Sequence, residues 1–207
     1  MKVYLIRHGE TNWNLEKRIQ APDSSHLTQK GKEQALRWKK HFIENNMALD
    51  IIFSSNTLRT IETLALIFPQ YKNMPNVKID NRLNERYHTD LIGKNKEDIE
   101  RELGLILPGR LSHHLYFRGT NKSLLTGKFP QEETMESVGK RVISFGEEMK
   151  KLPYKSKVLL IGHSIFNRYI VEYLTYATIG EIMPHEKQDN DELILLDIDE
   201  DCKVVEK

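Results

Sequence analysis

Three short apolar runs constrain the fold of this 207-residue chain more than any other feature of its sequence. They lie at residues 2–6, 50–53 and 157–161. Runs of this kind, rich in Val, Ile and Leu, are typical of parallel strands that are buried on both faces of a sheet. The first run leads directly into Arg7 and His8, and the third leads into Gly162 and His163. Because ligands bind beyond the carboxyl ends of the strands in open α/β sheets, the pattern predicts that these side chains meet in one crevice.

The segments between these runs predict an alternation of strands and helices. Apolar residues with helical spacing favour helices at about 29–45, from Thr57 to Pro69, from Asn95 to Gly104, from Thr134 to Pro153, and at about 165–176. Further strands are expected at 76–80 and at 193–198, the latter as an edge strand that is open to pairing with a second chain. This order indicates the α/β class, as a three-layer α/β/α sandwich with a mostly parallel central sheet. We expect one domain over residues 1–207, with a lid-like insertion at about 86–131.

The composition narrows the choice of partners. Basic and acidic residues number 31 and 30, and the resulting net charge of +1 favours neither nucleic acid nor an anionic membrane as the partner. The single cysteine, Cys202, cannot form an internal disulfide, which fits a reducing compartment. The apolar stretch before Arg7 is too short for a secretory signal, and no run is long enough to span a membrane. We therefore expect a cytoplasmic protein.

The polar residues near the predicted strand ends are suited to phosphoryl transfer. Guanidinium groups match phosphate geometry and stay charged, so Arg7 and Arg59 are the expected phosphate ligands. A neutral imidazole beside them, His8, can attack phosphorus and form a phosphohistidine. His163 is expected to be a further phosphate ligand. A carboxylic acid must protonate the leaving oxygen and later activate water, and Glu85, which follows the strand at 76–80, is the best-placed candidate.

Several segments, in this order, resemble the motifs of the histidine phosphatase superfamily, also called phosphoglycerate mutase-like proteins. The resemblance extends from residue 2 to about residue 170. The segments are Arg7-His8-Gly9-Glu10-Thr11 with Trp13-Asn14, Ser54-Ser55-Asn56-Thr57-Leu58-Arg59-Thr60, Leu83-Asn84-Glu85 with Gly93, Glu133 through Val142, and Gly162-His163.

This resemblance implies a role for each matching residue. His8 is the phosphorylated nucleophile and Glu85 is the proton donor, with neither a metal ion nor a cofactor. The family usually has glycine after its second histidine, whereas this chain has Ser164, which keeps the backbone N–H and adds a hydroxyl beside the phosphate. The residues that bind the phosphate are then Arg7, Asn14, Arg59, His163 and Ser164.

Some of the polar residues have a simpler interpretation. For Glu10 we favour a carboxylate that stabilises the loop over a catalytic one. Asn14 is equally compatible with a turn residue. Arg86, at the start of the insertion, is a lid candidate for a substrate contact, although we favour a solvated charge. His88 is expected to be a loop, surface or lid residue.

The function that we predict is metal-independent hydrolysis of phosphomonoesters through a phosphohistidine. A phosphotransferase of the phosphoglycerate mutase type is less favoured, because the chain has no adjacent pair of arginines and its insertion is short. A metalloenzyme is disfavoured because Arg7 and Arg59 would repel a dication. A non-catalytic phospholigand-binding protein needs neither a nucleophile nor an acid. A small phosphorylated substrate is expected, a phosphoprotein is also compatible, and the sequence does not indicate the oligomeric state.

Overall fold

The computed structural model describes residues 1–104, 133–182, 188–201 and 203–206. Its strands are β1 (Lys2–Arg7), β2 (Ile51–Ser54), β3 (Val77–Ile79), β4 (Lys157–Gly162), β5 (Leu193–Ile198) and β6 (Val204–Glu206). They form one six-stranded sheet in the order β3-β2-β4-β1-β5-β6. β1 to β4 are parallel, whereas β5 is antiparallel to β1 and β6 is antiparallel to β5. The predicted, mostly parallel sheet is therefore confirmed.

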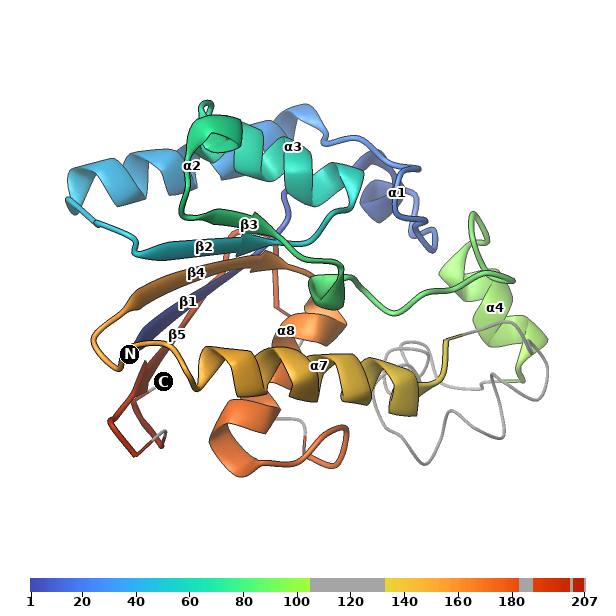
Figure 1. Cartoon of the computed structure of the whole chain (residues 1–207). Helices are drawn as coiled ribbons and strands as arrows, with labels where there is room; N and C mark the ends of the chain where they lie inside the picture. Colours follow the sequence, from blue (N-terminus) through green and yellow to red (C-terminus); the bar gives the residue numbers. More distant parts are fainter. Residues whose placement is uncertain (105–132, 183–187, 202, 207) are drawn as a thin grey trace.

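Helices cover both faces of this sheet, as Figure 1 shows. The helices are α1 (Asn12–Leu15), α2 (Gln29–Glu44), α3 (Leu58–Ile67), α4 (Lys96–Glu102), α7 (Met135–Met149) and α8 (Ser164–Tyr176), with 3₁₀ turns η1 (Tyr71–Asn73) and η2 (Asn81–Leu83). α2 and α3 lie on one face, and α7 and α8 lie on the other. This arrangement is the predicted three-layer sandwich.

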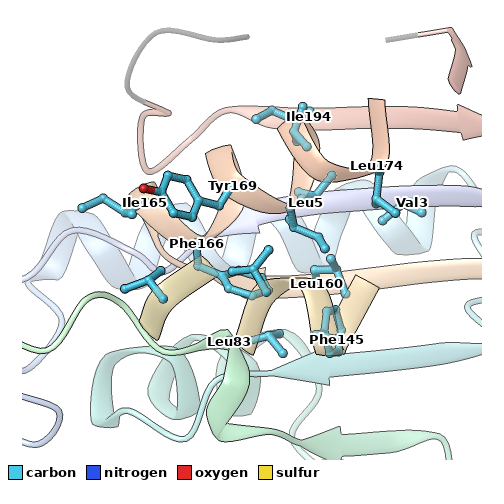
Figure 2. Close-up of a cluster of buried hydrophobic side chains, with 14 of the residues drawn as sticks. Val3, Leu5, Leu83, Phe145, Leu160, Ile165, Phe166, Tyr169, Leu174 and Ile194 are labelled. Atoms are coloured by element: carbon cyan, nitrogen blue, oxygen red, sulfur yellow. The ribbon is translucent and has the colours of Figure 1, made fainter. Parts of the chain in front are cut away.

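The alternation of side chains along β1 divides the core into two halves. Val3 and Leu5 pack with residues of α7 and α8, in the cluster drawn in Figure 2. Tyr4 and Ile6 point to the opposite face and pack with residues of α2 and α3. Successive side chains of a strand point to opposite faces, so a strand buried on both sides must be apolar throughout. The continuous apolar run that predicted β1 has this physical origin.

The strand at 193–198 is not an edge strand, so that prediction is wrong. β5 lies between β1 and β6, and β6 forms the edge. The chain reverses at Asp199, whose carboxylate accepts hydrogen bonds from the backbone N–H groups of Asp201 at 3.0 Å and Lys203 at 2.8 Å. This local turn directs residues 204–206 back along β5.

The observed helix bounds agree closely with those expected from the sequence. The caps of two helices differ, however, and the structure has one additional helical turn. Thr28 caps α2 by accepting a hydrogen bond from the N–H of Gly31. Thr57 occupies the same position before α3, but its hydroxyl makes no capping bond. The single turn α1 is not among the helices expected from the sequence. It is closed by a capping box between Thr11 and Asn14, and one turn is too short to have apolar periodicity.

The structure describes only the first part of the predicted insertion. α4 begins after Asn95, whose side chain accepts a hydrogen bond from the N–H of Glu97 at 2.9 Å. Residues 105–131 and Cys202 lie outside the described residues. Among the helices that are described, none is long and apolar enough to cross a membrane.

Candidate active site

The paired strands β1 and β4 end level with each other at one edge of the sheet. Arg7 lies opposite Gly162, and the backbone N–H of His8 donates to the carbonyl oxygen of Gly162 at 3.1 Å. The imidazoles of His8 and His163 consequently lie side by side, with ring centroids 5.2 Å apart. β2 is the other neighbour of β4, so the helix that follows it brings Arg59 to the same edge.

The loop after β1 is held by close backbone packing and by Glu10. A Cβ on Gly9 would lie 2.4 Å from the carbonyl oxygen of Gly31, so only glycine fits there. Glu10 accepts a hydrogen bond from the hydroxyl of Thr28 at 2.9 Å and lies 3.4 Å from the ammonium of Lys30. These contacts agree with the interpretation of Glu10 as a loop-stabilising carboxylate.

His8 is buried in a defined tautomeric state. Its Nδ1 lies 2.8 Å from the carbonyl oxygen of Gly9, which can only accept a hydrogen bond. The proton of the neutral ring is therefore on Nδ1, and Nε2 carries a free lone pair. Burial, followed by the positive charges of Arg59 and Arg7, lowers the pKa of His8 well below its usual value. The ring is neutral at physiological pH.

Arg7 and Arg59 place two buried cations beside this imidazole. Each makes one hydrogen bond to a carbonyl oxygen, from Arg7 to Gln188 at 3.1 Å and from Arg59 to Ala21 at 2.9 Å. Burial lowers the pKa of both, that of Arg59 to about 10, while the nearby carboxylate of Glu85 raises both. Both remain charged at neutral pH. The Nε atoms are buried and have no partner among the described residues, as expected of an anion site.

His163 is anchored through one ring nitrogen only. Its Nε2 lies 2.9 Å from the hydroxyl of Ser55 and 3.3 Å from that of Thr57. Its Nδ1 is buried and has no partner within the described part of the chain. Burial, and then the charge of Arg59, lowers the pKa of His163 well below its usual value.

Glu85 lies at the amino end of α8. Its carboxylate accepts the backbone N–H of Ile165 at 3.2 Å, which is a favourable place for a negative charge. The side chain is partly buried and lines the cavity together with His8 and His163. The electrostatic effect of Glu85 on both pocket arginines shows that the three charges lie close together.

Arg141 of α7 fixes the backbone of the segment that carries Glu85. Its guanidinium donates to three carbonyl oxygens, those of Arg82 at 2.7 Å, Glu85 at 3.1 Å, and Asn84. It also forms an ion pair with Glu133 at 3.0 Å. This role of Arg141 was not predicted, because no local sequence pattern connects α7 with a segment that lies more than 50 residues earlier in the chain.

Asn14 and Ser164 also reach the cavity. The side-chain oxygen of Asn14 accepts hydrogen bonds from the backbone N–H and the hydroxyl of Thr11, so this residue closes the turn α1 and lines the cavity as well. Ser164 is the first residue of α8. The structure therefore brings every site residue expected from the sequence to one cavity, namely Arg7, His8, Asn14, Arg59, Glu85, His163 and Ser164.

Other lining residues were not predicted. The favoured expectation for Arg86, a solvated charge, is wrong, because this side chain is 2% exposed. His88 lies in a loop, as one of its expected placements, and is buried. Arg86 donates to the carbonyl oxygen of Glu133 at 2.7 Å, which satisfies part of its buried guanidinium, and His88 lines the cavity. The additional lining residues are Arg18, Ile19, Gln20, His88, Lys96, Ile165 and Arg168.

The donor set suits an anion. In the described ranges, no group of three or more His, Cys, Asp or Glu side chains is arranged to hold a metal ion. Among the described lining residues, the cations outnumber the single carboxylate of Glu85: the lining holds the guanidiniums of four arginines, the ammonium of Lys96 and three imidazoles. Fixed cations beside a neutral imidazole are suited to holding a phosphoryl group while that imidazole attacks it.

Comparison with known proteins assigns the family. Residues 3–207 match the model of the histidine phosphatase superfamily, branch 1. The chain belongs to the histidine phosphatase superfamily. It is 31% identical over 172 residues to a protein named probable phosphoglycerate mutase GpmB from Escherichia coli (strain K12 / DH10B), which covers 80% of this chain and 70% of that relative.

Solved structures confirm the fold of this superfamily member. The alpha-ribazole phosphatase from Shigella flexneri has a TM-score of 0.77 and 22% identity, over 99% of this chain and 93% of that one. Bacillus stearothermophilus YhfR has a TM-score of 0.75 and 21% identity, over 98% and 93% of the two chains. Similar proteins are thus named as a mutase and as a phosphatase, so membership of the superfamily supports an enzyme but does not choose between the two activities.

Proposed function

We propose that this chain hydrolyses phosphomonoesters without a metal ion, through a phosphohistidine formed at Nε2 of His8. The observation that carries the proposal is the state of this side chain. Its Nδ1 is committed to the carbonyl oxygen of Gly9, and burial together with two guanidiniums keeps the ring neutral. His8 is thus a nucleophile at a pH at which Arg7 and Arg59 are still charged.

In the first step, the lone pair of His8 Nε2 forms a bond to phosphorus while the ester P–O bond breaks. The bonding electrons leave with the alkoxide oxygen, which takes a proton from Glu85; this step therefore needs Glu85 in its carboxylic acid form in the complex with the ester. In the second step, Glu85 removes a proton from water, whose oxygen bonds to phosphorus as the P–N bond breaks. Inorganic phosphate is released, and His8 returns to its neutral state.

The surrounding groups support the charge that develops on the phosphoryl oxygens. Arg7 and Arg59 supply fixed positive charge where water is largely excluded, which is where such charge has most effect. The amino end of α8 points its N–H groups at the site, and one of them holds Glu85. Ser164 and Asn14 offer further donors at the cavity wall.

A phosphotransferase of the mutase type is the second candidate, favoured by the similarity to GpmB. In that reaction the phosphoryl group returns to a bound hydroxy acid instead of water. The lack of an adjacent arginine pair in the sequence favours hydrolysis. We expect a phosphoglycerate isomer to release inorganic phosphate without forming the other isomer. Interconversion that is faster than phosphate release would make the protein a mutase.

The phosphohistidine is tested by trapping it. The protein is mixed with a radiolabelled aryl phosphate, whose leaving group needs no proton, and denatured in alkali, because phosphohistidine is labile in acid. We expect label on His8 in the wild-type protein, more label in Glu85→Gln, whose phosphoenzyme cannot activate water, and none in His8→Ala. Steady turnover without any labelled protein, or label that persists in His8→Ala, would contradict the mechanism. A panel of small phosphomonoesters and one phosphopeptide, ranked by kcat/KM, then identifies the substrate class.

A further inference from the structure

The hydroxyls of Thr57 and Ser55 lie next to Nε2 of His163. The hydrogen of the Thr57 hydroxyl is donated to Thr60 and not to this ring nitrogen, for the following reason. The hydroxyl of Thr60 donates to the carbonyl oxygens of Ser55 and Thr57, both at 2.8 Å. Thr60 therefore accepts in its 2.9 Å contact with the hydroxyl of Thr57. Thr57 has one hydrogen to give, and it goes to Thr60, so towards His163 it presents only a lone pair.

The hydrogen of the second hydroxyl is also directed away from the ring. Ser55 donates to the side-chain oxygen of Asn84 at 2.7 Å, its shortest contact, and accepts the backbone N–H of Thr57 at 3.3 Å. A lone pair of Ser55 therefore faces His163 Nε2 at 2.9 Å. With acceptors on both sides, Nε2 must be the donor. The proton of neutral His163 is consequently on Nε2.

This tautomer leaves Nδ1 without a proton, and Nδ1 is the ring nitrogen that remains for a ligand. It is buried and has no partner among the described residues. A bare nitrogen lone pair repels a phosphate oxygen, whereas an N–H donates to it. The neutral ring of His163 is therefore in the wrong state to bind the anion that its neighbours are placed to hold.

We propose that an anion enters this pocket together with one proton, which is taken up at Nδ1 of His163, and that Ser55 and Asn84 are positioning residues which impose this coupling. The proposal rests on the proposed function in that the natural anion is a phosphate. In the bound state, Nε2–H donates to Ser55 and Nδ1–H donates to the anion. His163 thus donates a hydrogen bond to the anion only after its ring has been protonated.

The charges around His163 explain why the proton arrives with the ligand. The described groups that act on the ring are Arg59 from α3, His8 directly after β1, Arg7 at the end of β1, and Arg141 from α7. The other charged or titratable side chains that line the same cavity are Glu85, Arg18, His88, Lys96 and Arg168. Burial and the guanidiniums lower the pKa of His163 in the empty pocket. A bound dianion adds negative charge beside the ring and favours the imidazolium. The affinity for the dianion is then expected to rise about tenfold for each unit by which the pH falls, as long as the ring of His163 is neutral in the ligand-free protein.

The tautomer is tested first, in the wild-type protein without ligand. Nitrogen NMR of ¹⁵N-histidine-labelled protein, assigned with His163→Gln, distinguishes protonated from unprotonated ring nitrogens. We expect Nε2 of His163 to be protonated and Nδ1 to be unprotonated. A proton on Nδ1 would overturn the proposal, because it would mean that Asn84 turns its NH₂ group towards Ser55 and reverses the chain of donors.

The coupling is tested by calorimetry with sulfate, which stays a dianion across the pH range used and so does not itself titrate. Binding at about pH 7 is measured in buffers of different ionisation enthalpy, which yields the protons taken up per sulfate. His8→Ala is the background, because it removes the imidazole that lies directly beside His163. His8→Ala/His163→Gln measures the uptake due to other groups, including Glu85.

We expect His8→Ala to take up about one proton more than His8→Ala/His163→Gln. His8→Ala/Ser55→Ala is expected to lose this difference, because the ring of His163 is then able to place its proton on Nδ1. A Ser55 that only supports the structure would weaken binding and leave the proton count unchanged, which would overturn the proposal, as would no difference between the first two variants. Sulfate binding with the wrong count refutes only this inference, whereas failure to trap label on His8 refutes the proposed function.

Discussion

Replacement of Glu85 by glutamine is expected to have opposite effects on anion binding and on turnover. The carboxylate accepts backbone N–H groups from Ile165 and Arg86, each at 3.2 Å, and a glutamine oxygen is able to keep at least one of these bonds. The shape of the site should therefore be preserved. What changes is that one negative charge near Arg7 and Arg59 is lost, together with the group that exchanges protons with the substrate.

The size of each effect follows from the position of Glu85. Two unit charges ~6 Å apart at an effective dielectric constant of about 20 interact by roughly 3 kcal/mol. Glu85 is partly exposed, so screening by water reduces its effect to about 1 kcal/mol, which is roughly fivefold in affinity. Phosphate and vanadate should therefore bind Glu85→Gln more tightly. Loss of the acid, in contrast, should lower kcat/KM for an alkyl phosphate by about 10²- to 10⁴-fold.

The assay compares an alkyl phosphate with an aryl phosphate, whose leaving group needs no proton. We expect kcat/KM for the aryl ester to fall far less, and we expect the initial burst of phenol to persist even where slow phosphoenzyme breakdown lowers kcat. Vanadate inhibition is measured on the same preparations. Equal losses for the two esters would show that Glu85 is not the acid, and weaker vanadate binding would show that its charge does not act on the pocket arginines.

Four further changes test separate parts of the site. His8→Ala should abolish turnover while circular dichroism shows an intact fold; activity within about tenfold of wild type would exclude this nucleophile. Arg59→Lys should lower kcat/KM by at least about 10²-fold and weaken vanadate inhibition, because lysine cannot reproduce the planar guanidinium, and a change below about threefold would place Arg59 outside the reaction. Arg141→Met should lower the free energy of unfolding by about 2 kcal/mol in urea titrations and slow alkyl esters more than aryl esters, since it releases the segment of Glu85. Finally, the pKa values of His8 and His163 are depressed in the folded protein, so the unfolded chain binds more protons at these side chains. Their contribution to stability is therefore complete above about pH 6.5 and is lost as the pH falls below it. Urea titrations should show this loss of stability, and the loss should be smaller in His8→Ala/His163→Gln.

Local sequence patterns predicted much of this site, because a residue that follows a strand in the sequence lies at a known edge of the sheet. Arg7 and His8 directly follow an apolar run, and His163 follows another one. Parallel strands end at a common edge, so residues that are remote in the chain become neighbours without any further information. The same reasoning failed for Arg86. Charged side chains are normally solvated, but this one is buried and donates a hydrogen bond to the carbonyl oxygen of Glu133, a residue that is remote in the chain.

Contacts between distant segments were beyond the reach of these patterns. Arg141 donates a hydrogen bond to the carbonyl oxygen of Glu85, and Arg7 donates one to the carbonyl oxygen of Gln188. No sequence pattern connects the two residues of either pair. The return of the chain as β6 was also missed, because a three-residue strand has too few side chains to show alternation. Such features depend on which segments meet, and that is settled only when the whole chain has packed.

The sequence by itself determined the order of strands and helices, the edge of the sheet at which the site lies, and the residue types that meet there. Only the tertiary structure decided where the protons are. A histidine has the same two ring nitrogens in any sequence, and its neighbours decide which nitrogen carries hydrogen. The carbonyl oxygen of Gly9 makes this choice for His8, and the hydroxyl of Ser55, itself directed by Asn84, makes it for His163. A nucleophile and a phosphate ligand therefore arise from the same kind of side chain because the packed chain presents each ring with different hydrogen-bond acceptors.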